Sequence, residues 1–261
     1  MLGSLKDFLT FPVRALFLFD EDRFGLTSLR TERLTCVAGE VRGQCLDMGC
    51  GPGNVFVKRF LGGKGRGVDV FRYPGLCRKD IVDPLRLPFP SGSFGTVTLI
   101  AAINHIPARH RDAELAELFR VLEPGGRIIV TMGNPAAEVL VHKLSAALNR
   151  EDMDSRRGMD EDETYFMRDA EIAARLRKAG FAIGPRKVFW SQWGLNHLLI
   201  GIKPGNARLG RPALGRRPCA KAFIQTETRF YRGAQILRPC HRGQRALQVL
   251  RERQGPRRHQ H

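Results

Sequence analysis

The stretch CLDMGCGPGN, residues 45–54, decides the fold of this 261-residue chain. A short apolar run carries an acidic residue, Asp47, and leads into glycines at the alternate positions Gly49, Gly51 and Gly53. Glycine lets the backbone turn tightly and lets a ligand approach where a Cβ atom would clash. Apolar residues continue from position 55, so the stretch predicts a strand, a ligand-binding turn and a helix.

The spacing of these glycines indicates which kind of nucleotide-like ligand the turn would hold. Sites for dinucleotides usually read Gly-x-Gly-x-x-Gly and place a pyrophosphate on the helix N-terminus. Here Asp47 lies two residues before the first glycine, where a carboxylate repels a pyrophosphate and suits a cationic ligand. The alternative is a glycine turn that serves only the close packing of strand and helix.

Three more blocks follow the glycine turn in the chain. Asp69 lies near the end of a second apolar stretch, residues 65–70, 22 residues after Asp47. In a doubly wound sheet, an acidic residue at this position binds the ribose hydroxyls of a nucleotide. Asp83 begins the block DPLRLPFPSGSF, residues 83–94, and the block FRVLEPGGRIIV occupies residues 119–130.

Together the four blocks resemble the motifs of the class I S-adenosylmethionine-dependent methyltransferases, in the broad small-molecule branch that is similar to methyltransferase type 11. The resemblance covers roughly residues 20–204. It implies an α/β fold, Rossmann-like and doubly wound, with a mostly parallel seven-stranded sheet and an antiparallel C-terminal strand. It also implies S-adenosyl-L-methionine as the cofactor, which carries an ammonium and a sulfonium group but no phosphate.

The resemblance implies roles for individual residues of the cofactor site. Asp69 would accept the ribose hydroxyls, and Asp83 would accept the adenine amino group, with Asp80 as the nearby competitor. Alternatively, Asp83 is a turn residue before Pro84. The predicted cofactor-binding residues are Asp47, Gly49, Gly51, Gly53, Asn54, Asp69, Val70, Asp83 and Asn104.

The chain departs from the family pattern at one visible position. After the Ser93-Phe94 pair the family usually has an aspartate, whereas this chain has Gly95. In the family that aspartate caps or orients the start of the next strand and does not touch the methyl group. The difference therefore bears on local rigidity more than on catalysis.

The expected chemistry needs few catalytic side chains. A sulfonium is already an activated leaving group, and orientation of the reactants alone supplies ~7–11 kcal/mol. An oxygen, carbon or protonated nitrogen acceptor still needs a base, and His105 is the candidate because an imidazole titrates near neutrality. Many relatives have a histidine at this point, before the pair that matches Ile106 and Pro107. The alternative is that His105 packs or contacts the cofactor without moving a proton.

Alternation of strand and helix patterns predicts a parallel sheet. We expect Gly180 to end the last helix. Residues 150–167 interrupt the pattern and form either a substrate-covering insertion or a solvated connection. The predicted strands are 44–48, 65–70, one near 81–82, 96–103 and 127–132, with a closing antiparallel edge hairpin at about 182–190 and 195–202; the predicted helices are 54–61, 111–122, 136–149 and 168–179.

Three segments are expected along the chain: an amino-terminal helical lid or packing segment, residues 1–43, the methyltransferase domain, residues 44–204, and a basic tail, residues 205–261. The apolar residues 8–19 are too few to span a bilayer and lack a basic leader. We expect them to pack over the active-site side of the sheet, with weak contact to a membrane surface as the alternative. Residues 23–28 predict a turn before a helix that reaches Val41.

The net charge of +17 is unevenly distributed. Residues 205–261 hold fourteen Lys/Arg and two Glu, and this composition predicts disorder. Such an arm would contact RNA or an anionic surface, or it is a solvated extension without a partner. The six cysteines form no Cys-x-x-Cys pair, so neither a metal site nor a disulfide framework is expected, and a cytoplasmic location fits.

These features predict a methyltransferase (EC 2.1.1.-) that acts on a small-molecule acceptor, apolar and lipid-like or quinone-like. The alternatives are an RNA methyltransferase that uses the basic tail, and a catalytically inactive module that binds S-adenosylmethionine. Enzymes that methylate base amines usually carry an Asn/Asp-Pro-Pro-aromatic motif after the fourth strand, whereas residues 102–107 read AINHIP. No oligomeric state follows from the sequence.

Overall fold

The computed structural model describes residues 5–18, 20–134, 164 and 167–205. All of them belong to one unit, Met1–Arg208. The predicted helix 136–149, nearly all of the segment 150–167 and the basic tail from residue 206 onward lie outside the described residues.

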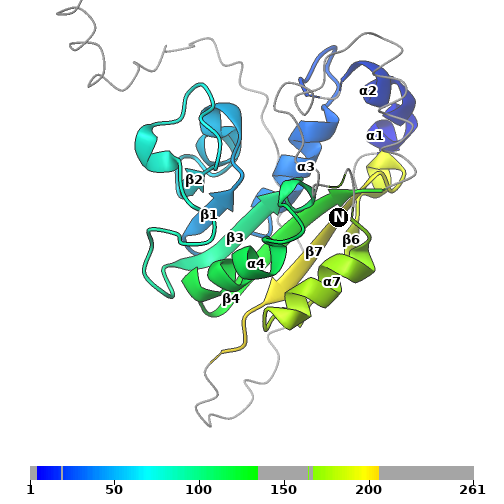
Figure 1. Cartoon of the computed structure of the whole chain (residues 1–261). Helices are drawn as coiled ribbons and strands as arrows, with labels where there is room; N and C mark the ends of the chain where they lie inside the picture. Colours follow the sequence, from blue (N-terminus) through cyan, green and yellow to red (C-terminus); the bar gives the residue numbers. More distant parts are fainter. Residues whose placement is uncertain (1–4, 19, 135–163, 165–166, 206–261) are drawn as a thin grey trace, which may run out of the picture. The chain divides into compact units, whose positions relative to one another are not determined.

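A seven-stranded sheet runs through this unit in the order β2-β1-β3-β4-β7-β5, with β6 also paired to β7 (Figure 1). The first four strands are parallel, and β7 pairs antiparallel with β4, β5 and β6. The predicted Rossmann-like fold with antiparallel strands at the C-terminal end is confirmed. The strands are β1 (Cys45–Met48), β2 (Arg66–Val68), β3 (Phe94–Ile100), β4 (Leu122–Gly133), β5 (Ala182–Ile183), β6 (Lys187–Val188) and β7 (Asn196–Ile202).

Helices cover both faces of the sheet. On one face, Leu118 of α4 and Ile172 of α7 belong to a core cluster with residues of β1, β3 and β4. On the other face, Val37 of α3 packs with Phe56 and Ile129. Figure 1 shows α4 and α7 in front of the sheet and α3 behind it. The helices are α1 (Leu5–Leu9), α2 (Phe11–Phe17), α3 (Leu29–Ala38), α4 (Arg111–Val121) and α7 (Asp169–Lys178).

The helix predicted at 54–61 is present, but it is not a regular α-helix. A 3-10 turn, Pro52–Asn54, leads into a single π-helical turn, Phe56–Phe60, in which the Leu61 N–H donates to the Phe56 carbonyl at 3.3 Å. Gly62 and Gly63 follow with φ of 58° and 80°, a conformation that ends the helix. The predicted end at residue 61 thus agrees with the structure, whereas the apolar spacing did not indicate the 3-10 and π-helical geometry.

Two strand predictions were also wrong in part. The strand expected at 96–103 ends at Ile100, because Ala101 takes a left-handed conformation with φ of 49°. The strand expected at 182–190 is split into β5 and β6 around Pro185, whose ring removes a donor from the ladder. Only part of the closing hairpin lies at the edge of the sheet, because β7 lies between β4 and β5.

Gly95 has a steric explanation. A Cβ atom at this position would lie 2.6 Å from the Arg42 carbonyl oxygen, 2.9 Å from Glu123 Oε1 and 3.2 Å from Gly43 Cα. The segment before β1 therefore occupies the space that an aspartate would need. Close backbone packing replaces a side-chain cap at the start of β3.

The amino-terminal helices are attached by a buried arginine. Arg14 is fully buried, and its Nε and Nη1 atoms donate to the carbonyls of Thr27 and Asp7 at 2.6 and 2.9 Å. Its Nη2 atom pairs with Glu32 of α3, which also accepts from Gln192 at 3.1 Å. The amino-terminal segment is thus joined to α3 and to the segment before β7.

Aromatic contacts strengthen the same junction. The Phe8 ring stacks on Trp190 with a centroid distance of 4.2 Å, and Trp193 Nε1 donates to the Phe8 carbonyl at 3.0 Å. These contacts give α1 a packing role; its predicted role as a lid stays a prediction. None of the helices within the described ranges is long and apolar enough to cross a membrane.

We expect Arg14→Met to lower the free energy of unfolding by about 3 kcal/mol, because it leaves the Glu32 carboxylate with an unmatched buried charge. Chemical denaturation measures this loss. The control is Arg23→Met, since Arg23 pairs with Glu21 on the surface and exposed pairs contribute little. Equal effects of the two substitutions would contradict the anchoring role of Arg14.

Candidate active site

The carboxyl ends of β1 and β2 are joined through the glycine turn. The N–H groups of Gly49 and Cys50 both donate to the Val68 carbonyl, at 2.9 and 3.1 Å. The Gly51 N–H donates to Asp69 Oδ2 at 2.9 Å. The turn is therefore held against the end of β2 by three consecutive amide groups.

At all three glycines of the turn the backbone adopts a conformation that a side chain would strain. Gly49, Gly51 and Gly53 have φ of 76°, 64° and 73°, and Gly51 combines its φ with a ψ of −170°, a region populated almost entirely by glycine. A Cβ atom on Gly49 would lie 3.0 Å from the Ala102 Cβ atom. A Cβ atom on Gly51 would meet no atom within 4 Å, so the turn borders open space at that residue.

Asp69 fixes the end of β2 with both carboxylate oxygens. Oδ2 accepts the Gly51 N–H and Oδ1 accepts the Phe71 N–H, each at 2.9 Å, and the residue is 4% exposed. Each carboxylate oxygen can accept more than one hydrogen bond. The side chain can therefore hold the two loops and still receive a hydroxyl group.

Asp47 is a buried residue near the carboxyl end of β1, a strand that lies between β2 and β3. It pairs with Thr98 of β3 in the parallel ladder, and its Oδ1 accepts the Thr98 hydroxyl at 2.6 Å. Burial raises the pKa of Asp47 to about 7, with a further contribution from the negative charge of Asp69, although the Thr98 hydrogen bond opposes the shift. Such a carboxylate is poised to gain a cationic partner.

Asn54 and Val70 both lie beside the turn, but the Asn54 side chain packs against β2 whereas Val70 is exposed. Asn54 has φ of 51°, and its side chain lies directly over Gly67 of β2, where a Cβ atom would come within 2.2 Å of Asn54 Oδ1. That oxygen is buried and has no hydrogen-bond partner among the described residues. Val70 is 42% exposed beside Asp69. The structure places both near the turn, with the Asn54 side chain directed onto β2.

The two candidates for adenine recognition already make local contacts. Asp83 is exposed, and its Oδ1 accepts the Leu85 N–H at 2.9 Å, as expected of a turn residue. Asp80 accepts the Cys77 N–H at 3.0 Å and lies 3.4 Å from Arg66 Nη2. A parallel bridge between Asp69 and Ile81 keeps both close to the end of β2.

Asn104 and His105 lie in a 3-10 turn, Ile103–His105, that follows β3. Asn104 is buried, its Nδ2 lies 3.2 Å from His105 Nε2, and its carbonyl accepts from Thr164 N at 3.1 Å. The half-buried His105 ring thus has a polar neighbour.

Sequence reasoning missed two charged residues of α4. Arg111 is buried and donates from Nε to the Ile106 carbonyl at 2.8 Å and from Nη2 to the Asn104 carbonyl at 3.2 Å. Glu114 is also buried, and burial together with the charge of Asp69 raises its pKa to about 7. Helical spacing from Leu118 places Glu114 on the buried face, which was a usable signal.

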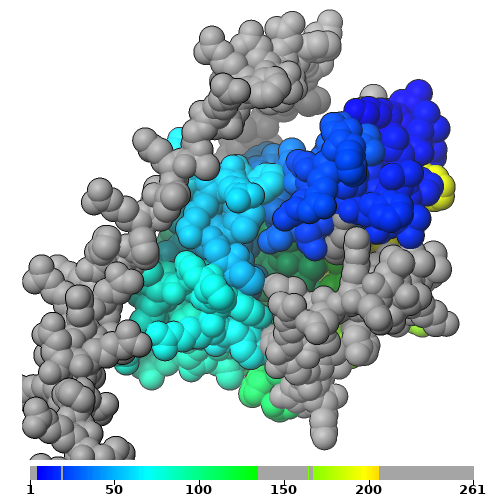
Figure 2. Space-filling view, turned by 90° about the horizontal axis from the view of Figure 1, so that it is seen from above, coloured from blue at the N-terminus to red at the C-terminus, as the bar shows by residue number. Residues whose placement is uncertain are grey.

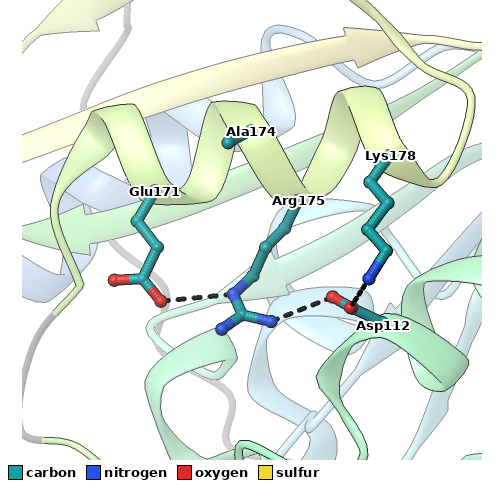
Figure 3. A pocket seen from close by; sticks show the side chains of 5 residues that line it. All are labelled: Asp112, Glu171, Ala174, Arg175 and Lys178. Carbon is teal, nitrogen blue, oxygen red and sulfur yellow. Dashed lines mark hydrogen bonds and ion pairs between the residues drawn. The ribbon is translucent and has the colours of Figure 1, made fainter.

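A surface hollow between α4 and α7 is a different kind of feature. Figure 3 shows Arg175 of α7 between Glu171 and Asp112, with Lys178 also directed at Asp112. The Arg175–Asp112 and Arg175–Glu171 distances are 2.9 and 3.2 Å. These charged side chains already pair with one another and thereby join α4 to α7. The hollow that they line therefore does not resemble a cofactor site.

Figure 2 shows the molecule from above relative to Figure 1. In this view the surface is hollowed between the light-blue and cyan residues of the β1–β2 region and the dark-blue amino-terminal helices. Green atoms lie deeper in this hollow. The strand ends that carry Asp47 and Asp69 belong to the light-blue and cyan part of the chain.

Comparison with known proteins decides the family. The sequence profile described as "Methyltransferase domain" matches residues 19–184, well over half of the chain. The chain belongs to the methyltransferase domain family. S-adenosylmethionine is the cofactor that this family and fold imply. The glycine turn fits it, since Gly51 leaves open space beside two buried carboxylates that can face a cation and a ribose.

Individual relatives match shorter parts. Methyltransferase GfsG of Streptomyces halstedii is 31% identical over 121 residues, 40% of this chain and 42% of that protein. The ubiquinone/menaquinone biosynthesis C-methyltransferase UbiE of Cupriavidus necator is 39% identical over 61 residues, 21% of this chain and 24% of that protein. The matches to these two relatives thus span less than half of their length.

Among solved structures, the PH0226 protein of Pyrococcus horikoshii OT3 has the same fold. The superposition has a TM-score of 0.52 at 18% sequence identity and covers 77% of this chain and 100% of that chain. The likeness supports the arrangement of strands and helices described above.

We expect Gly51→Ala to lower stability by about 1–3 kcal/mol through backbone strain and to weaken S-adenosylhomocysteine binding at least tenfold. Gly125→Ala is the matched control, because Gly125 also has a positive φ, 81°, and open space around a built Cβ, but lies in the turn within β4. Calorimetric titration measures the affinity. Equal affinity losses in both variants would remove the turn from the site.

Asp47→Asn should stabilise the ligand-free protein at pH 8. The pKa of Asp47 is raised from 3.8 to about 7 in the folded state, so the folded protein retains a proton that the unfolded chain has released. Stability therefore falls as pH rises from about 4 to 7, and removing the charge restores up to about 4 kcal/mol above pH 7.

Denaturation curves at pH 4 and pH 8 test this sign. The control is Asp112→Asn, because Lys178 lowers the pKa of Asp112 and the substitution should destabilise slightly at pH 8. An Asp47→Asn variant that is less stable than the natural protein at pH 8 would contradict the assignment of a buried, costly charge.

Proposed function

We propose that this protein transfers a methyl group from S-adenosylmethionine to a small, apolar acceptor of lipid-like or quinone-like character. The observation that carries the proposal is the pairing of Asp47 and Asp69, two buried carboxylates, with a turn that leaves open space at Gly51. When bound, S-adenosylmethionine supplies an activated methyl group on a sulfonium. The protein's task is then to orient the reactants and to exclude water.

Each proposed cofactor residue has a physical task. Asp69 accepts ribose hydroxyls with lone pairs left free by Gly51 and Phe71. Asp47 supplies negative charge to the cationic amino-acid end, held in place by Thr98. Gly49 and Gly53 shape the turn. The remaining contacts are proposed for Asn54, Val70, Asp83 and Asn104 at the rim and floor of the same site.

His105 is the proposed general base where the acceptor carries an acidic O–H or C–H. Its ring is half-buried after β3, at the same edge of the sheet as Asp47 and Asp69. Asn104 Nδ2 lies 3.2 Å from His105 Nε2, so the neighbouring amide can orient the ring. A neutral imidazole can receive a proton.

The character of the acceptor rests on weaker support. UbiE proteins are named for ubiquinone and menaquinone biosynthesis, and they match this chain over short stretches. The amino-terminal helices also expose apolar side chains, including Phe17 at 58% and Leu9 at 65%. Both observations favour an apolar acceptor. The basic tail supports RNA as the second candidate, because residues 205–261 carry most of the net charge.

A labelled methyl donor and a metabolite extract test the proposal. We expect label in a small, organic-soluble product identified by mass spectrometry. Label in RNA that declines steeply with salt would favour the RNA alternative. Binding of S-adenosylhomocysteine without label transfer to any fraction would favour an inactive binding module.

Two variants separate binding from chemistry. Asp69→Ala should abolish S-adenosylhomocysteine binding, because it removes the ribose acceptor and releases the turn. His105→Ala should leave that affinity within about twofold and reduce turnover 10²- to 10⁴-fold, the usual contribution of a general base. Unchanged turnover would remove His105 from the mechanism, and unchanged binding in Asp69→Ala would place the site elsewhere.

A further inference from the structure

The loop that follows β2, residues 70–79, carries basic and apolar side chains next to the proposed site. It begins directly after Asp69, whose Oδ1 accepts the Phe71 N–H at 2.9 Å. Its middle is held against the glycine turn, because the Gly53 N–H donates to the Pro74 carbonyl at 3.0 Å. The loop therefore lies at the carboxyl end of β2, beside the turn that the cofactor is proposed to contact.

Basic side chains extend from this loop along β2. Residues 58–79 hold seven Lys/Arg and one acidic residue, the buried Asp69. Arg66 of β2 lies 3.4 Å from Asp80. Among the described residues, the other six form no ion pair with a carboxylate, and all six are exposed: Lys58, Arg59, Lys64, Arg72, Arg78 and Lys79. We refer to these seven basic residues as the β2 basic surface.

Hydrogen bonds bring the parts of the β2 basic surface together. Arg66 Nη2 donates to the Lys79 carbonyl at 3.3 Å, which places the end of the loop beside β2. The Gly63 N–H donates to the Val57 carbonyl at 2.8 Å, so the π-helical turn that carries two of the cations lies beside Lys64. Neighbouring cations without carboxylate partners repel one another, and an anionic partner would relieve that repulsion.

Exposed apolar side chains accompany the cations where the loop borders the site. Val70 is 42% exposed and Phe71 is 39% exposed. On the opposite side of the hollow in Figure 2, the amino-terminal helices expose the apolar side chains of Leu5, Leu9, Val13 and Phe17. Apolar side chains combined with cations are typical of surfaces that bind anionic bilayers. An RNA strand would engage cations and aromatic rings but not exposed aliphatic side chains, so the observations favour lipid.

We propose that the loop of residues 70–79 docks on the surface of an anionic phospholipid bilayer. Phe71 enters the boundary between headgroups and acyl chains, and the β2 basic surface contacts the headgroup phosphates. This orientation turns the hollow beside the glycine turn toward the membrane, where a lipid-like acceptor would enter. The inference goes beyond the proposed function, because docking requires neither the cofactor nor methyl transfer.

Fluorescence quenching by lipid tests the insertion of Phe71 directly. The full-length Phe71→Trp variant is mixed with vesicles of phosphatidylcholine and phosphatidylglycerol whose acyl chains are brominated, and the emission of the natural protein is subtracted. We expect bromine to quench the added emission. Ile202→Trp is the matched control, because Ile202 is 37% exposed and pairs with Arg127, at the opposite end of the parallel strands. The emission added by this control should not be quenched.

A charge reversal tests the contribution of the cations. Arg72→Glu should weaken sedimentation with the same lipids, without bromine, about tenfold, because it removes one attraction to the headgroups and adds a repulsion. Arg177→Glu is the control, since Arg177 is exposed on α7 and its reversal changes the net charge equally. It should weaken binding less than about twofold, because salt screens charges far from the membrane. Neither variant should change the melting temperature.

The outcomes separate docking from catalysis. Equal quenching in Phe71→Trp and Ile202→Trp would mean attraction by net charge alone and would overturn the proposal. Absence of quenching in Phe71→Trp, with loss of poly(U) RNA binding in Arg72→Glu, would assign the surface to RNA and also overturn it. If Phe71→Trp is quenched but the natural protein binds no S-adenosylhomocysteine, docking stands and the proposed function fails. Binding of S-adenosylhomocysteine without quenching in Phe71→Trp overturns docking alone.

Discussion

The hydrogen bond between the Gly51 N–H and Asp69 Oδ2, 2.9 Å long, is the contact on which the site depends. It joins the turn after β1 to the end of β2, and the second Asp69 oxygen holds the Phe71 N–H in the same way. Because Gly51 occupies a backbone region that other residues avoid, the turn can pass close to Asp69 without a side chain in the way. One carboxylate thus shapes the turn and remains able to accept a ligand.

The same constraint concentrates negative charge. Asp47, Asp69 and Glu114 are all buried, and the charge of Asp69 contributes to raising the pKa values of the other two to about 7. A ligand-free site of this kind lowers the stability of the fold at neutral pH. A cationic adenosyl ligand would offset that cost, so stability and cofactor affinity are coupled through the same side chains. This coupling is a common feature of binding sites.

The sequence predicted the architecture well where local chemistry controls it. The alternate glycines, the carboxylates near the ends of β1 and β2, and the apolar face of α4 all follow from residue type and spacing. Gly180 ends α7 with φ of 101°, as a C-cap glycine does. The predicted turn before α3 is also present, with Ser28 accepting the Thr31 N–H.

The errors arose where distant segments control the outcome. The end of β3 at Ala101 is set by contacts with Thr131 of β4, at 3.0 Å to its hydroxyl. Gly95 is required by the packing of residues 42–43, which no local pattern shows. Arg14 and Arg111 are buried through contacts with distant segments, which only the tertiary structure reveals.

A crystal structure of the protein with S-adenosylhomocysteine tests the central claim most directly. The account predicts the ribose hydroxyls within hydrogen-bonding distance of Asp69, with the ligand passing over Gly51 and its amino group near Asp47. Well-ordered ligand at any other place, or a cleft beside Asp47 and Asp69 closed by protein atoms, would contradict it.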